Sequence, residues 1–86
     1  MTKRAICVIA KEISEDWLDI SDEAYPYVIA MLQLRKITDT YYLETAEDII
    51  TRFLNESSKW KSKKSRRIKK ELKQYIKNSK VVIKEN

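Results

Sequence analysis

The sequence predicts an all-α fold, a compact bundle of four short helices of which the last is basic and amphipathic. Apolar residues recur at helical spacing in four segments of the chain. The chain contains no glycine, so the usual two-residue hairpin turns are missing from its sequence. With 86 residues, 43% of them apolar, it is large enough for one small domain. We expect residues 1–78 to form this domain and residues 79–86 to form a C-terminal tail.

The first helix is expected over residues 3–17, with Thr2 as its N-cap. Its apolar side chains repeat at intervals of three and four residues, namely Ile6, Ile9, Ala10, Ile13 and Trp17. The charged residues of the segment fall outside that stripe, so one face of the helix is expected to be buried.

A second helix is expected to begin at Ser21 or Asp22 and to run to Ile37. Pro26 lies in its first turn, where a residue without an N–H group loses no intrahelical hydrogen bond. Residues 27–37 are apolar on nearly every side, which is typical of a helix that is buried on several sides. We therefore expect this helix to be the central one.

Residues 38–44 are expected to form a packed loop, because their β-branched and aromatic residues find no second strand as a partner. Within this loop Tyr41 is expected to face the core and Tyr42 the solvent. A third helix is expected from Thr45, which forms a variant capping box with Asp48 three residues later. The buried face of this helix comprises Ala46, Ile49, Ile50, Phe53 and Leu54.

The fourth helix is expected from its N-cap at Ser62 to about Asn78, with a narrow apolar stripe of Ile68, Leu72, Tyr75 and Ile76. Cations line one face of this helix and lie on its two flanks; the face holds Lys63, Arg66, Lys70, Lys73 and Lys77, and the flanks hold Arg67 and Lys69. Residues 57–86 carry a net charge of +10, whereas residues 1–56 carry −5. The apolar residues 81–83 of the tail suit either folding back onto the domain or pairing with another chain.

The basic face of the fourth helix indicates an anionic partner. Like charges three or four residues apart on a helix repel each other, whereas a surface that is only solvated normally mixes signs. Nucleic acid fits best, because such cations can follow a phosphate backbone. The alternatives are an acidic protein surface, a membrane surface, the acidic half of the same protein within a monomer or dimer, and no partner. The last two helices follow the order of a helix-turn-helix motif, but without the usual turn glycine.

Missing residue types exclude most catalytic sites. The chain has no histidine and a single cysteine, Cys7, so ordinary zinc sites and Ser–His or Cys–His nucleophile pairs are not available. Without glycine there is no phosphate-binding loop. We expect no enzymatic activity, no cofactor and no metal, with Cys7, Trp17 and Trp60 serving as packing residues. The longest uncharged apolar stretch, residues 24–34, is too short to span a membrane, and no secretion signal is evident, so a cytoplasmic location is expected.

Five segments of the chain form a distinctive pattern: residues 5–13 (AICVIAKEI), 24–31 (AYPYVIAM), 49–55 (IITRFLN), 60–61 (WK) and 68–73 (IKKELK). Over about residues 5–73 this pattern resembles a family of small uncharacterised helical proteins of phages and prophages. This chain has Tyr42 and Ser62 at two positions where members of the group tend to have glycine. None of these motifs is catalytic. The resemblance implies a small intracellular accessory protein of a mobile element, acting in the cytoplasm of the host cell.

The leading functional hypothesis is therefore a non-catalytic, phage-type accessory protein that binds nucleic acid through its basic C-terminal helix. The alternative is a protein-binding inhibitor of a host factor, similar to anti-defence or anti-CRISPR proteins, which occupies an acidic or nucleic-acid-binding surface. A third hypothesis is a homo-oligomer in which acidic and basic halves pair. All of these place the binding residues at Lys63, Arg66, Arg67, Lys69, Lys70, Lys73 and Lys77.

Overall fold

The protein is mostly helical, but it is not purely all-α. The computed structural model describes the backbone of residues 4–84 and the side chains of residues 4–77. In chain order its elements are α1 (Ile6–Asp16), α2 (Tyr25–Met31), β1 (Thr40–Tyr41), β2 (Glu44–Thr45), α3 (Ala46–Asn55) and α4 (Lys63–Lys84). The expected number of helices is confirmed. Two expectations are wrong, because a small two-stranded sheet is present and because α4, with 22 residues, is not short.

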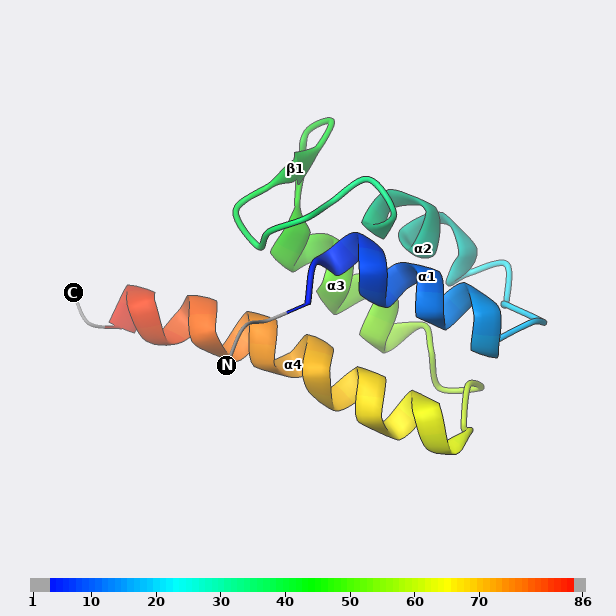
Figure 1. Cartoon of the computed structure of the whole chain (residues 1–86). Coiled ribbons are helices and arrows are strands. Elements are labelled where there is room, and N and C mark those ends of the chain that lie inside the picture. Colours follow the sequence, from blue (N-terminus) through cyan, green and yellow to red (C-terminus); the bar gives the residue numbers. More distant parts are fainter. Residues whose placement is uncertain (1–3, 85–86) are drawn as a thin grey trace.

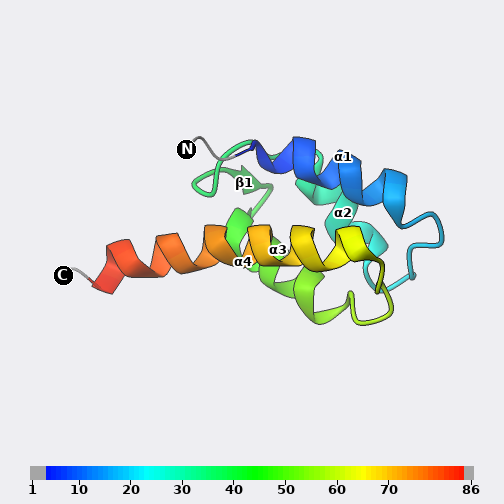
Figure 2. The ribbon, with the colours of Figure 1, turned by 60° about the horizontal axis from the view of Figure 1, so that its bottom comes forward.

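The helices are arranged so that α1 and α3 lie between α2 on one side and α4 on the other (Figures 1 and 2). Each of the two middle helices packs against both outer ones. The expectation that the second helix is central is therefore wrong. Ile29 of α2 remains 36% exposed and Tyr25 54% exposed, because only one side of this outer helix meets the core.

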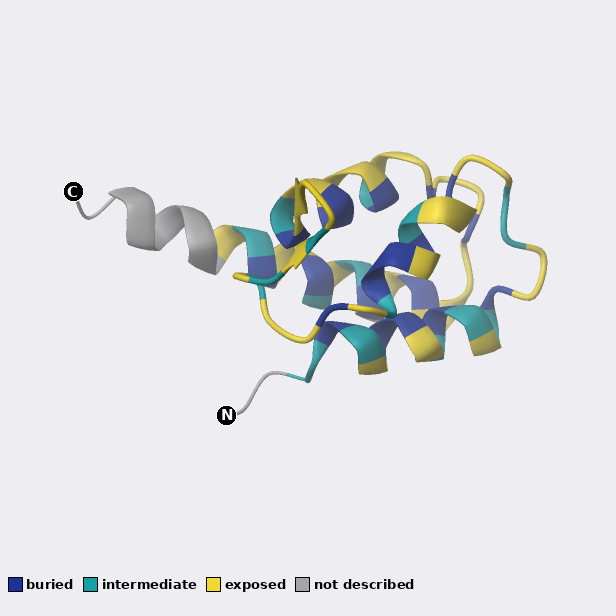
Figure 3. Cartoon of the chain, turned by 90° about the horizontal axis from the view of Figure 1, so that it is seen from above, coloured by how far each residue is buried: buried dark blue, intermediate teal, exposed yellow. Residues whose placement is uncertain are grey.

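The core consists of the buried stripes of the four helices, which Figure 3 shows in dark blue, and it includes a cluster of aromatic rings. The rings of Trp17 and Trp60 stack with centroids 5.7 Å apart, and both contact the edge of Phe53. Ile68 and Leu72, on the predicted apolar stripe of α4, are fully buried. The two tryptophans are thus packing residues, as expected, and such aromatic pairs add about 0.5–1.5 kcal/mol each beyond the area that they bury.

The start of α1 is set by tertiary contacts. The helix begins at Ile6 after an N-cap, Ala5, that makes no side-chain cap hydrogen bond. The amide of Ile6 donates to the carbonyl of Arg35 at 3.1 Å, and the amide of Cys7 donates to the carbonyl of Leu34 at 2.7 Å. Since a neighbouring segment satisfies these first amides, no capping side chain is needed. The predicted cap, Thr2, lies outside the described residues.

The second helix is shorter than expected and ends at Met31 instead of Ile37. The chain then tightens, because the amide of Leu34 donates to the carbonyl three residues earlier, that of Met31. This turn points the carbonyls of residues 34–35 toward α1. At the start, the carbonyl of Ser21 accepts from the amides of residues 24–25, and Pro26 lies in the first turn as expected.

Residues 38–45 form an antiparallel hairpin instead of the expected packed loop. Thr40 pairs with Thr45 and Tyr41 with Glu44, so the missing partner strand consists of the last residue of the expected loop, Glu44, and the expected first residue of the third helix, Thr45. The turn needs a positive φ, and in the absence of glycine Tyr42 adopts it, at 57°. Tyr41 is half-buried and Tyr42 is 85% exposed, which confirms the expected difference between them.

Both predicted caps of the last two helices are confirmed. The hydroxyl of Thr45 accepts from the amide of Asp48 at 3.1 Å, and the hydroxyl of Ser62 accepts from the amide of Ser65 at 3.1 Å. The helix that Ser62 caps runs to Lys84, beyond the expected end at Asn78, so residues 79–84 of the predicted tail continue the helix. The packing of the apolar residues 81–83 lies outside the described side chains.

Candidate nucleic-acid interface

One face of α4 carries a continuous line of exposed cations. Its opposite face packs against α1 and α3 through Ser65, Ile68, Leu72 and Tyr75, which are all buried. The solvent side presents what we term the basic ridge, which consists of Lys63, Arg66, Lys70, Lys73 and Lys77. These residues follow one another at intervals of three and four, so they span about 21 Å along the helix at 1.5 Å per residue. The five predicted face residues are thus brought together.

The ridge cations are not neutralised by acids of the same molecule. Among the residues that the structure describes, none of the five forms an ion pair or a side-chain hydrogen bond. The cations that do pair with acids are Arg4, Lys64 and Arg67, which all meet Glu12. Within the described part of the monomer, the acidic half therefore leaves the ridge charge free.

Arg67, predicted on the flank of the basic face, is used inside the protein. Its Nη2 atom donates to Glu12 Oε2 of α1 at 2.5 Å, and its Nη1 atom lies 3.9 Å from Glu71 Oε1. The guanidinium is half-exposed, but its orientation is set by these carboxylates. Arg67 therefore lies beside the ridge and joins α4 to α1.

Lys69, the other flanking residue, points toward the link between α3 and α4. Its Nζ atom donates to the carbonyls of Ser57 at 2.7 Å and Trp60 at 2.8 Å, and it lies 5.8 Å from the Trp60 ring centroid. Burial, followed by the charges of Lys73 and Lys61, lowers the pKa of this amine. Lys69 is thus a structural lysine that binds two carbonyls of the link between α3 and α4.

Sequence periodicity missed Lys61. It is exposed, and its charge acts on Lys69 together with that of Lys73, so it extends the positive potential from the ridge toward the link. It precedes the N-cap Ser62 and so lies outside the helical pattern that identified the other cations. The link itself covers residues 56–62, longer than the three or four residues of a helix-turn-helix turn.

The start of α4 is fixed to the end of α1 by Asp16. One oxygen, Oδ2, accepts from the indole Nε1 of Trp60 at 2.9 Å and from the hydroxyl of Ser62 at 2.5 Å. The hydrogen bond from Ser62, followed by that from Trp60, lowers the pKa of Asp16. Because Ser62 also caps α4, this carboxylate joins the end of α1 to the first turn of the basic helix.

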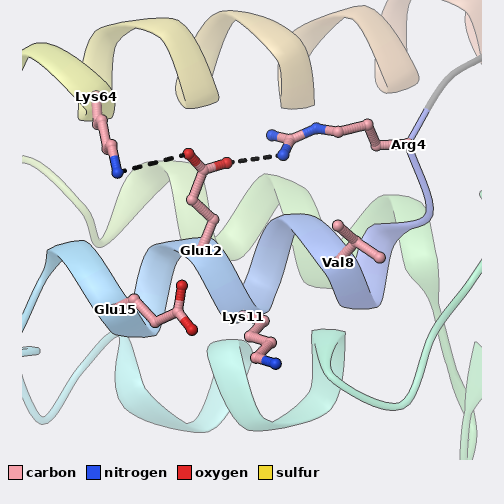
Figure 4. A pocket seen from close by; sticks show the side chains of 6 residues that line it. All are labelled: Arg4, Val8, Lys11, Glu12, Glu15 and Lys64. Carbon is pink, nitrogen blue, oxygen red and sulfur yellow. Dashed lines mark ion pairs between the residues drawn. The ribbon is translucent and has the colours of Figure 1, made fainter.

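A shallow pocket of about 340 Å³ lies beside α4, where α1 approaches its first turns; Arg4, Val8, Lys11, Glu12, Glu15 and Lys64 line it. Figure 4 shows Glu12 between Arg4 and Lys64. Arg4 also forms a bidentate pair with Glu71, at 2.7 and 2.9 Å. Burial raises the pKa of Glu12, but hydrogen bonds from Arg4 and Arg67 outweigh it, so the net shift is downward. This network joins the N-terminal segment to α1 and α4.

The pocket brings together no nucleophile and base, and the described residues contain no His, Cys, Asp and Glu cluster that could hold a metal ion. Cys7 is half-buried in α1. Within the described part of the chain, no helix has the length and apolar character needed to cross a bilayer.

No protein-family model, curated protein or solved structure matches this chain. The resemblance to phage and prophage proteins therefore stays a prediction, and function has to be argued from the site itself.

Proposed function

We propose that this chain is a non-catalytic protein that binds nucleic acid through the basic ridge of α4. The observation that carries the proposal is the line of five exposed cations that have no acidic partner among the described residues. Each consecutive pair along this line stands three or four residues apart and repels. A phosphate backbone relieves this repulsion, and each cation that contacts a phosphate releases a condensed counterion.

The placement of the first cations also favours binding over stability. Lys63 lies in the first turn of α4, which contains no acidic residue, and it has no acidic partner among the described residues, whereas its neighbour Lys64 pairs with Glu12. The helix dipole disfavours positive charge at this end, by about 0.3–1 kcal/mol per residue. Asp16 and the N-cap Ser62 offset that cost and hold the helix in place. The fold thus holds Lys63 at a position where its charge does not stabilise the helix, which favours a role in binding.

A group of four exposed acids lies outside α4. Glu15, Asp19, Asp22 and Glu23 are all exposed at the end of α1 and in the link to α2. A polyanion would be repelled from this region and attracted by the ridge, so the charge separation would orient the protein during association.

The experiment that tests the proposal compares two triple variants of equal charge. The ridge variant is Arg66→Gln/Lys70→Gln/Lys73→Gln, and the control variant is Lys11→Gln/Arg35→Gln/Lys36→Gln, which changes exposed cations that do not belong to α4. Fluorescence anisotropy with a labelled oligonucleotide at about 50 mM salt should show binding by the wild type and the control variant, because electrostatic binding is strong at that ionic strength. The ridge variant should bind at least about tenfold more weakly. A wild type that binds neither DNA nor RNA refutes the proposal.

The second candidate, an inhibitor that binds a host protein, is favoured by the hairpin apex, which we define as Tyr42 and Leu43. These side chains are 85% and 100% exposed, and paired exposed apolar side chains of this kind suit protein interfaces. Affinity purification with and without nuclease separates the two candidates. A stoichiometric protein that survives nuclease treatment and is lost in Leu43→Asp favours the inhibitor, whereas nuclease-sensitive recovery favours nucleic-acid binding.

A further inference from the structure

We infer that the basic ridge selects double-stranded over single-stranded nucleic acid. The inference rests on the proposed function and specifies its ligand. It follows from where the aromatic side chains lie, from the shape of the ridge and from the surface beside it.

The first argument is that the ridge offers no ring on which an unpaired base could stack. The rings of Trp17, Phe53, Trp60 and Tyr75 are buried, and those of Tyr27 and Tyr41 are half-buried. The exposed tyrosines are Tyr25 in α2 and Tyr42 at the hairpin apex. Both elements lie across the α1 and α3 layer from α4 (Figure 1). Proteins that bind single strands rely on stacked bases for much of their affinity, and a strand that follows this ridge finds none.

The second argument is that the ridge matches a stiff and densely charged ligand. Its cations lie on one convex helical face and rise in steps of about 4.5 and 6 Å along the axis. A duplex carries one charge per about 1.7 Å and stays straight over about 50 nm, so its backbone meets such an array without being ordered first. A single strand has a lower charge density and loses conformational freedom when it is held along a straight face.

The third argument is that the surface beside the ridge does not form a channel for a strand. The shallow pocket between α1 and α4 is lined by three cations, Arg4, Lys11 and Lys64, and by the carboxylates of Glu12 and Glu15, and none of its lining residues is aromatic (Figure 4). Arg4 and Lys64 pair with Glu12, so much of the positive charge in the pocket is used within the protein. A single strand that leaves the ridge on this side therefore meets no stacking platform.

The size of the preference follows from counterion release. The slope of log K against log salt is about −0.9 per contact for duplex DNA and about −0.7 per contact for single strands. With five contacts the slopes differ by about one unit. If the duplex and the single strand bind with equal affinity at 1 M salt, the duplex is expected to bind about tenfold more tightly than the single strand at 0.1 M salt.

The experiment is an anisotropy titration of wild-type protein at about 0.1 M salt with a mixed-sequence duplex of about 20 base pairs and with each of its strands alone. DNA and RNA versions form two arms, because both duplexes carry the same phosphate chemistry. A duplex preference of about tenfold in either arm, retained by the control variant and reduced in the ridge variant, supports the inference. Equal or tighter binding of the single strands overturns it and leaves the proposed function standing. Binding of neither ligand refutes the proposed function itself.

A gain-of-function variant tests the stacking argument separately. Gln74 is exposed on α4 next to the ridge, between the turns that carry Lys70 and Lys77. Gln74→Trp places a ring where a single strand would run, so it should raise single-strand affinity several-fold and duplex affinity much less. Gln74→Leu is the matched apolar control and should change neither affinity. A Gln74→Trp protein whose duplex preference equals that of the wild type contradicts the claim that the missing ring sets the preference.

Discussion

The carboxylate of Asp16, at the end of α1, accepts a hydrogen bond of 2.5 Å from the hydroxyl of Ser62, the N-cap of α4. Forty-six positions separate the two residues in the sequence. The same carboxylate also holds the indole of Trp60. A single acid thus connects the end of α1 to the N-cap of the basic helix and to the link before it.

Asp16→Ala is therefore expected to lower the thermal midpoint, because it leaves the indole and the hydroxyl without this acceptor. The effect should depend on pH. The folded-state pKa of Asp16 lies below its ordinary value of 3.8, so its contribution is complete above about pH 4 and is lost as the pH falls through the folded-state value. Thermal melts should thus show a gap between wild type and variant at pH 7 that narrows as the pH falls below the ordinary pKa of 3.8. Asp19→Ala, which removes an exposed acid, is the control. If the gap between wild type and Asp16→Ala stays constant with pH, the negative charge of Asp16 does not contribute to its stabilising effect.

Lys69 and Lys70 are adjacent in sequence, but they are expected to respond oppositely to substitution. Lys69→Ala removes the Nζ donor from the carbonyls of Ser57 and Trp60, of which that of Ser57 keeps the amide of Trp60, so it should destabilise the fold by about 1–3 kcal/mol in urea unfolding. Lys70→Ala removes an exposed ridge cation and should change stability by less than about 0.5 kcal/mol. Nucleic-acid affinity should fall in Lys70→Ala and change little in Lys69→Ala. The reverse pattern would mean that the structural role given to Lys69 and the binding role given to Lys70 are wrong.

Leu72 should tolerate no charge. It is fully buried on the inner face of α4, so Leu72→Asp places an unpaired carboxylate among apolar side chains and should unfold a domain whose total stability is about 5 kcal/mol. The matched control is Gln74→Asp, two positions away on the exposed side of the same helix, which should melt close to the wild type. Circular dichroism measures both. A Leu72→Asp protein with an unchanged cooperative transition would overturn the orientation of α4.

The hairpin turn should be improved by glycine. Tyr42 has a φ of 57°, where a residue with a Cβ atom is disfavoured by about 1–2 kcal/mol. Glycine removes this cost, but it also raises the entropy of the unfolded chain, which offsets part of the stabilisation. Tyr42→Gly is thus expected to stabilise the fold by up to about 1 kcal/mol, measured by urea unfolding. Tyr42→Val, which keeps the Cβ atom and adds β-branching, should destabilise it. Clear destabilisation by glycine would show that the contact of Tyr42 with the Tyr41 ring, at 4.7 Å between centroids, outweighs the backbone strain.

Local signals predicted those features of the fold that depend on neighbouring residues in the sequence. The caps at Thr45 and Ser62 and the buried stripe of Ile68 and Leu72 follow from side-chain chemistry and helical spacing, and all are present. The start of α1 depends instead on the carbonyl of Leu34, which reaches the amide of Cys7 only in the folded chain. No local pattern carries that information.

The hairpin and the sorting of the cations escaped prediction for similar reasons. Tyr42 adopts a positive φ, which sequence patterns normally indicate by a glycine, and without a glycine the turn was not predicted. Arg67 and Lys69 look like their neighbours on a helical projection. They differ because Glu12 lies on one side of α4 and the carbonyls of Ser57 and Trp60 lie on the other. Only the packing of α4 against α1 and α3 distinguishes the structural cations from the exposed ones.

The most direct test of the central claim is the salt dependence of duplex binding by the wild type and the ridge variant. Five phosphate contacts predict a slope of log K against log salt of about −4.5, and removal of three of them predicts about −1.8. The control variant should keep the wild-type slope. A slope near zero for the wild type, or the same steep slope in the ridge variant, would show that the ridge of α4 is not where this protein meets phosphate.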